Sequence, residues 1–155
     1  MFFGILIAFM ALLADQASKF YIDTQLVIDK PIIVCDFFNV VKVWNTGISF
    51  SLFNDYGNGG KIALICFALV VVVFLLRWMY YEENRLKIFG LALIIGGALG
   101  NITDRLRAGA VLDFLDFHYN TLHWPAFNLA DTFICVGAFL LIWYELSAKR
   151  NQKYR

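Results

Sequence analysis

The sequence predicts a membrane protein with an all-α core of four transmembrane helices and a small β-rich extracytoplasmic subdomain. The composition supports this fold class, because 61% of the 155 residues are hydrophobic, 16% are charged and the mean hydropathy is +0.68. Soluble domains are about 45–50% apolar and about 25% charged, and a chain of this length could not hide so much apolar surface from water. The formal net charge of +1 excludes a generally basic nucleic-acid binder, so we expect no nucleic-acid partner.

Four stretches of the sequence are long and apolar enough to cross a bilayer, which takes about 20 mainly apolar residues. We predict spans at approximately 2–22, 62–81, 88–106 and 126–146. The first stretch resembles a cleaved signal peptide, but no Lys or Arg precedes its apolar run and the run continues past Asp15, so we expect a retained span. Without internal repeats or a domain boundary, residues 1–155 are expected to form a single domain.

Charge distribution predicts the orientation of these spans. Four spans place both termini on one side, where they share seven Lys and Arg residues and three Glu residues with the short turn at 82–87. The opposite side has six basic residues and nine aspartates. The excess of basic residues is small, but the compact basic tail after Ser147 adds to it and favours cytoplasmic termini. The loops at 23–61 and 107–124 are then expected to face outward.

The loop at 23–61 is predicted to form a small sheet at the outer membrane surface. Residues 32–53 are dense in β-branched and aromatic side chains, which favour strands. The stretches 40–43 and 47–53 also alternate in side-chain character, as half-buried strands do. Turn-forming residues at 54–60 are expected to close the segment, and the glycines Gly57, Gly59 and Gly60 suggest a lid that opens for substrate.

Ionisable residues in the predicted spans are candidate functional residues, because placing an ionisable side chain in the bilayer costs free energy. Asp15 and Lys19 are four residues apart, so they can pair on one helix face. Asn101, Asp104 and Arg105 also share a helix face, where the Arg fork can hold a carboxylate. The structural alternative for both groups is an ion pair or polar clamp within the helix bundle.

Two further pairs of polar residues lie in the first turns of the fourth predicted span and in the loop before it. Asn128 and Asp131 are three residues apart in its first turns, and Asp131 lies beyond the expected N-cap. Asp113 and Asp116 stand in an apolar stretch, where a strand and a helix would place them differently. Periodicity does not decide between these two structures.

In the third span, Gly96 and Gly100 form a pair of small residues that permits close helix packing.

The sequence lacks motifs for metal, phosphate or covalent chemistry. It has no GxSxG, HExxH, GxxxxGK[ST] or GxGxxG pattern, and its three cysteines have neither metal-ligand nor disulfide spacing. His118 and His123 are five apart in an aromatic loop, and Ser18 and Lys19 are adjacent, so they would not face each other on a helix. We therefore expect no metal and no cofactor.

Carboxylates remain as candidate catalytic groups. Two carboxylates held close together at a membrane edge cannot both ionise, so they share a proton. The ionised group can act as a base on water while the protonated group polarises a scissile carbonyl. Two other classes also fit the residues alone. A small transporter or proton-relay subunit would place carboxylates in its spans. A non-catalytic membrane scaffold would bind partners through the helix face of Gly96 and Gly100 and through the aromatic loops.

Five sequence blocks in order make the whole chain resemble a known family. They are Asp15-Gln16-Ala17-Ser18-Lys19, Asn45-Thr46-Gly47, GNITDR at 100–105, VLDF at 111–114 and FNLAD at 127–131. The chain resembles bacterial lipoprotein signal peptidases, also called signal peptidase II, which are intramembrane aspartic peptidases. One departure follows the second block, where Ile48 and Ser49 replace the two small residues usual in the family.

The resemblance implies roles for individual residues. Asp113 and Asp131 match the two catalytic aspartates of the family, which selects Asp113 over Asp116. Residues expected to support the dyad or contact substrate are Asn101, Asp104, Arg105, Asn128, Asn45, Asp15 and Lys19. The three cysteines match no family motif, so no role transfers to them.

The resemblance also implies a reaction and its setting. The expected substrate is a diacylglyceryl-modified prolipoprotein, cleaved on the N-terminal side of its lipidated cysteine by water activated between two aspartates. Other expected partners are membrane lipid and an inhibitor of the globomycin type. We expect a monomer in the bacterial cytoplasmic (inner) membrane, with its active site near the outer leaflet.

Overall fold

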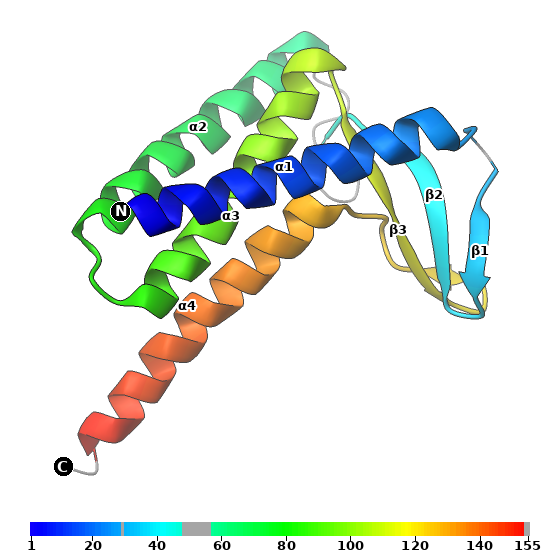
Figure 1. The fold of residues 1–155 in the computed structure, drawn as a ribbon. Helices are drawn as coiled ribbons and strands as arrows, with labels where there is room; N and C mark the ends of the chain where they lie inside the picture. Colours follow the sequence, from blue (N-terminus) through cyan, green and yellow to red (C-terminus); the bar gives the residue numbers. More distant parts are fainter. Residues whose placement is uncertain (29, 48–56, 154–155) are drawn as a thin grey trace.

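Four long helices form the core of the protein. The computed structural model describes residues 1–28, 30–47 and 57–153. Its helices are α1 (Phe2–Gln25), α2 (Gly57–Tyr81), α3 (Arg85–Arg107) and α4 (Leu129–Lys153) (Figure 1). Within the described residues, four helical stretches are long and apolar enough to cross a membrane: Phe2–Gln25, Gly59–Tyr81, Arg85–Arg107 and Leu129–Ala148. They confirm the four predicted spans to within a few residues at each end.

Helix α3 is the central helix of the bundle and packs against α1, α2 and α4. In its most apolar stretch 56% of residues are buried, compared with 11–28% in the other three helices. Glycines permit these close contacts: a Cβ at Gly96 would lie 2.5 Å from the carbonyl oxygen of Ala8, and one at Gly97 would overlap the carbonyl oxygen of Ala130. The predicted packing role of Gly96 and Gly100 is confirmed, because a Cβ at Gly100 would overlap Asp15 Oδ2 on α1 and lie 3.4 Å from Ala130 Cβ on α4.

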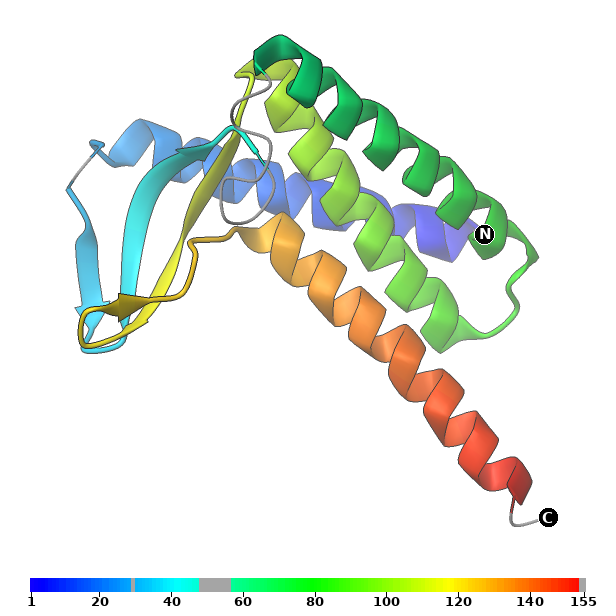
Figure 2. The same cartoon turned by 180° about the vertical axis from the view of Figure 1, so that it is seen from behind.

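The two ends of the bundle differ. The chain termini and the α2–α3 turn lie at one end, and the β-sheet lies at the other, while the C-terminal part of α4 projects beyond the remaining helices (Figures 1 and 2). Asn84 caps α3 by accepting hydrogen bonds from the backbone N–H groups of Leu86 and Lys87. Its Nδ2 also donates to the Tyr144 hydroxyl at 3.1 Å, which ties α4 to the turn.

A four-stranded antiparallel sheet covers the other end of the bundle. Its strands are β1 (Ile32–Cys35), β2 (Phe38–Asn45), β3 (Val111–Tyr119) and β4 (Leu122–His123), in the order β1-β2-β3-β4. Leu112 and Phe114 on β3 pack against Ile22 and Leu26 at the end of α1, which anchors the sheet to the helices. The sheet confirms the predicted β-rich subdomain, and it shows that Asp113 and Asp116 lie on a strand.

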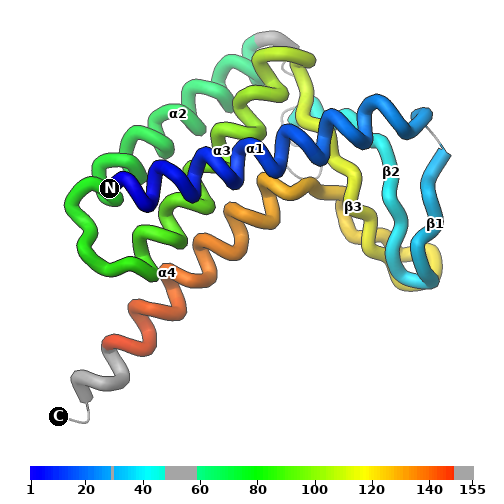
Figure 3. The backbone as a smooth tube through the Cα atoms, viewed as in Figure 1, coloured from blue at the N-terminus to red at the C-terminus, as the bar shows by residue number. Residues whose placement is uncertain are grey.

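Some predicted boundaries differ from the structure. The turn predicted at Gly57, Gly59 and Gly60 is wrong, because these residues form the first turn of α2, and residues 54–56 of the same predicted turn lie outside the described residues. The lid stays a prediction. The stretch 40–43 lies in β2, as predicted, whereas 48–53, including Ile48 and Ser49, falls outside the described residues. Helix α4 begins at 129 rather than 126, because the chain before it returns along β3, where Phe127 pairs with Leu115 (Figure 3).

Candidate active site

Lys19 is the centre of a buried polar cluster between α1 and α3. Its Nζ lies 2.9 Å from Asp15 Oδ2 and 2.7 Å from Asp104 Oδ2. It also donates to Asn101 Oδ1 at 3.0 Å, so all three of its N–H donors have acceptors. The predicted Asp15–Lys19 pair is present, and Asp104 joins it from the neighbouring helix. Separating α1 from α3 would leave buried charges without a partner, which costs free energy. These contacts therefore fix α1 against α3.

The same cluster holds the start of α4. Asp15 Oδ1 accepts a hydrogen bond from the backbone N–H of Ala130 at 2.9 Å. Gln16, to which the sequence assigned no role, donates from Nε2 to Asp104 Oδ1 at 2.8 Å and to the carbonyl of Gly100 at 3.3 Å. The cluster therefore fixes three helices in a position that brings the first turn of α4 beside α3.

Asp113 is a buried carboxylate held by two asparagines. It is 3% exposed, and its oxygens accept hydrogen bonds from Asn45 Nδ2 at 3.0 Å and from Asn128 Nδ2 at 2.6 Å. Burial raises the pKa of Asp113 to about 6, and the negative charge of Asp131 acts in the same direction. The hydrogen bonds from the two asparagines favour the ionised form and lower the pKa of Asp113 in part.

Asp131 lies in the first turn of α4 and shares Asn128 with Asp113. Its Oδ1 accepts from Asn101 Nδ2 at 2.8 Å, and its Oδ2 accepts from the backbone N–H of Asn128 at 3.3 Å. In return, its backbone N–H donates to Asn128 Oδ1 at 3.0 Å. This reciprocal arrangement is a capping box, with Asn128 at the N-cap and Asp131 three residues later. Asp131 lies beyond the N-cap, as predicted, but the sequence prediction missed that its side chain and its backbone N–H both take part in the cap.

Arg105 binds backbone oxygens instead of a carboxylate. Its guanidinium donates to the carbonyl of Gly47 at 3.0 Å and to that of Asn101 at 3.4 Å. Among the described residues it forms no ion pair, and its buried Nε has no hydrogen-bond partner. The predicted fork from Arg105 to a carboxylate is wrong, because Asp104 pairs with Lys19 instead. Arg105 still lies within electrostatic range of both Asp113 and Asp131.

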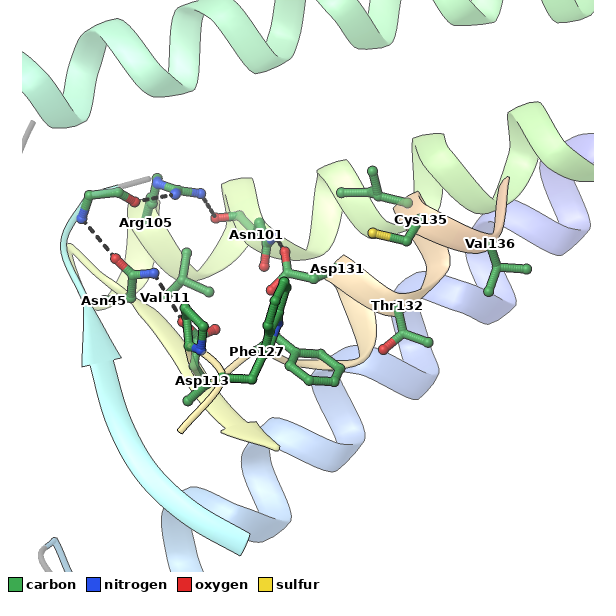
Figure 4. A pocket seen from close by; sticks show the side chains of 15 residues that line it. Asn45, Asn101, Arg105, Val111, Asp113, Phe127, Asp131, Thr132, Cys135 and Val136 are labelled. Carbon is green, nitrogen blue, oxygen red and sulfur yellow. Dashed lines mark hydrogen bonds between the residues drawn. The ribbon is translucent and has the colours of Figure 1, made fainter. Parts of the chain in front are cut away.

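The two aspartates line one cavity of about 540 Å³ between the sheet and α3 and α4 (Figure 4). Much of the remaining lining is apolar and comes from residues 124–127 before α4 and from Ile134 and Val136 on α4. Of the predicted site residues, the structure places at this cavity Asn45, Asn101, Arg105, Asp113 and Asp131. The remaining four support these residues from behind the cavity: Asp15, Lys19, Asp104 and Asn128.

Several lining residues were not foreseen from the sequence. The carbonyl of Gly47 holds Arg105, and the cavity is also lined by Trp124, Pro125, Ala126, Phe127 and Thr132. Asp116, the alternative to Asp113, has different partners, Asn39 and His123. Within the described ranges, no group of three or more His, Cys, Asp or Glu side chains is placed to hold a metal ion.

Comparisons with known proteins agree with this arrangement. The family model of signal peptidase (SPase) II matches residues 7–147. A lipoprotein signal peptidase from Anaplasma phagocytophilum is 38% identical over 153 residues, covering 96% of this chain and 94% of the relative. One from Rhodopseudomonas palustris (strain TIE-1) is 42% identical over 149 residues, covering 92% and 91%.

A solved structure also matches. A bacterial membrane enzyme determined by the in meso method has a TM-score of 0.88 and 26% sequence identity, with 100% of this chain and 94% of that chain covered. The fold of four helices and a small sheet is thus shared with a membrane enzyme over the full length. Together with the match to the family model, these similarities show that the chain belongs to the signal peptidase II family.

Proposed function

We propose that this protein is a lipoprotein signal peptidase that works as an aspartic endopeptidase. Its substrate is a diacylglyceryl-modified prolipoprotein, and the bond cleaved is the one on the N-terminal side of the lipidated cysteine. Family membership supports the peptidase activity and the prolipoprotein substrate. The catalytic groups are Asp113 and Asp131, and the reaction requires neither a metal nor a cofactor.

The observation that carries the aspartic mechanism is the shared partner of the two carboxylates. Asn128 donates from its side chain to Asp113 and from its backbone to Asp131, and both carboxylates line the same cavity. Burial and the charge of Asp131 raise the pKa of Asp113, which favours a state in which the pair holds one proton. Such a pair titrates as a unit.

The proposed reaction proceeds by acid–base catalysis on a water molecule between the two aspartates. The ionised carboxylate removes a proton from the water, whose oxygen attacks the scissile carbonyl carbon. The protonated carboxyl donates its proton to the carbonyl oxygen, and a tetrahedral diol forms. The carboxyl that now holds the proton donates it to the nitrogen of the leaving amine, while the other carboxylate takes a proton from a diol hydroxyl. The C–N bond breaks, a new carboxyl group forms on the product, and the dyad again holds one proton. Arg105 lies at the cavity and stabilises the partial negative charge that develops on the carbonyl oxygen before the proton transfer to it is complete.

The active site is proposed to lie near the outer leaflet of the bacterial cytoplasmic (inner) membrane. The sheet and the cavity are at the end of the bundle opposite to the termini, and the sequence places more basic residues on the side of the termini. In this orientation both termini are cytoplasmic, and a substrate helix reaches the cavity laterally through lipid. Residues 1–155 act as one domain and as a monomer, and an inhibitor of the globomycin type occupies the site between the aspartates.

A cleavage assay tests this proposal. Purified protein in detergent is incubated with a diacylglyceryl-modified prolipoprotein and, separately, with the unmodified precursor, and products are separated by gel shift. We expect cleavage of the lipidated substrate alone, and no turnover with Asp113→Asn or Asp131→Asn. Asp36→Asn, which removes an exposed carboxylate in the turn between β1 and β2, is the matched control and should cleave normally. Robust cleavage by either of the first two variants would refute the dyad.

A further inference from the structure

Asp116 is a buried carboxylate that the proposed reaction does not use. It is 6% exposed and lies three residues after Asp113 on β3, so the two side chains point to opposite faces of the sheet. Asn39, directly opposite on β2, donates from Nδ2 to Asp116 Oδ2 at 3.1 Å. Nδ1 of His123 on β4 lies 2.9 Å and 3.0 Å from the two oxygens of the same carboxylate. Asn39, Asp116 and His123, here called the clasp, thus join three strands through side chains.

Backbone pairing by itself holds this edge of the sheet weakly. Strand β4 has only two residues, and the chain after His123 returns along β3 without forming a regular strand. The Trp124 N–H donates to the carbonyl of Phe117 at 2.8 Å, and Pro125 has no N–H to donate. The ladder resumes only at the N–H of Phe127. The clasp therefore adds a side-chain contact where the backbone contacts are sparse.

The segment that begins after the clasp forms a wall of the cavity. Trp124, Pro125, Ala126 and Phe127 all line it, and they lead directly into Asn128. Figure 4 labels Phe127 and Asp113 among the side chains that line the same cavity. Because His123 immediately precedes this wall segment (124–127), the bond from His123 to Asp116 sets where the wall starts relative to β3.

We propose that Asp116 and His123 are positioning residues that fix the wall segment against bound substrate. The inference rests on the proposed peptidase function. The two residues touch neither the substrate nor the reacting atoms, and they act through the backbone of the wall. Without their bond, the wall segment samples positions farther from the substrate, while the dyad and its asparagines keep their contacts. Loss of the bond should therefore raise KM and leave kcat nearly unchanged.

Three variants separate this role from a general loss of structure. His123→Phe keeps a ring and removes the donor, whereas His123→Asn keeps a nitrogen donor at the same number of bonds from the backbone. His118→Phe is the matched control, because its ring stacks on that of His123 at 4.9 Å and its Nδ1 faces Asn120 rather than Asp116. KM and kcat are measured with the lipidated prolipoprotein, and amide hydrogen exchange of the wall segment is measured without substrate.

Removing a hydrogen bond to a charged group shifts an equilibrium by about ten-fold or more, so we expect an increase of that size in KM for His123→Phe. His123→Asn should restore most of the wild-type KM, and His118→Phe should match wild type. An unchanged KM in His123→Phe, or equal losses in both His123 variants, would overturn the proposal.

Amide hydrogen exchange tests the clasp without depending on peptidase activity. If wild type does not cleave, the proposed function fails, but the clasp is still tested by exchange in the wall segment, which should be faster in His123→Phe than in His118→Phe. Equal exchange in these two variants would overturn the clasp. If His123→Phe does not fold, His123→Ala takes its place, because it removes the same donor from a side chain that is 51% exposed. An unchanged KM and unchanged exchange in that variant would overturn the proposal in the same way.

Discussion

Replacing Asp113 by Asn should change the way in which stability depends on pH. Burial raises the pKa of Asp113 from its ordinary value of 3.8 to about 6. The folded protein therefore binds this proton more tightly than the unfolded chain does. The resulting stabilisation is fully present below pH 3.8 and is lost as the pH rises through about 6. Since one pKa unit corresponds to about 1.4 kcal/mol, the loss amounts to about 3 kcal/mol.

Thermal unfolding in detergent measures this loss, with the fluorescence of the four tryptophans as the signal. The Asn side chain has no proton to lose, so any constant effect of the substitution cancels when the two proteins are compared across pH. For a chain of this size, about 3 kcal/mol corresponds to a Tm change of about 6 to 12 °C. We expect the Tm of wild type to fall by this amount relative to Asp113→Asn between about pH 4 and pH 7.

Asp36→Asn serves as the control in the same experiment, because it removes a carboxylate that is exposed to water in the folded protein. Its Tm should follow that of wild type across the pH range. Parallel Tm curves for wild type and Asp113→Asn would refute the reasoning, because they would mean that burial imposes no penalty on the ionised carboxylate.

Three further perturbations address the contacts around the site. Asn45→Ala removes a donor to Asp113 and should raise its pKa further, so the alkaline limb of the pH profile of kcat/KM should move to higher pH; an unmoved limb would contradict this. Lys19→Met leaves two carboxylates without their cation, which costs about 3–5 kcal/mol for a broken buried pair, and should reduce the yield of monodisperse protein in size-exclusion chromatography. Wild-type yield would argue against the cluster as a structural tie. Gly97→Ala should separate α3 from α4 and lower both Tm and turnover, while Gly59→Ala, where a Cβ meets nothing within 4 Å, should not; equal effects would contradict the packing argument.

Structural features that are set by residues close together in the sequence could be predicted from the sequence. Span length and apolar composition identified the helices, and the four-residue spacing of Asp15 and Lys19 placed them on one helix face. Other features depend on residues distant in the sequence. The side chain of Arg105 fixes the number of its donors, but which oxygens accept from it depends on how Gly47 approaches α3.

The start of α4 shows the same limit. Pro125 is a reasonable first residue of a helix, so the sequence favours a start at 126. In the structure, backbone bonds between Leu115 and Phe127 keep the chain extended, and the helix begins only after Asn128. The proposed catalytic pair required the family resemblance for the choice between Asp113 and Asp116, because a strand and a helix were equally compatible with that stretch.

The polar cluster also has a consequence for the order in which the chain enters the membrane during synthesis. Asp15 and Lys19 neutralise each other within α1, so this helix carries its own counter-charge when it emerges from the ribosome. The partners Asn101 and Ala130 follow 82 residues after Lys19 and 115 residues after Asp15. The first helix can thus be inserted before the others exist, whereas the connections that assemble the proposed dyad form only after the last helix has been made. An incompletely synthesised chain would then already have its first helix in the membrane but lack the proposed dyad.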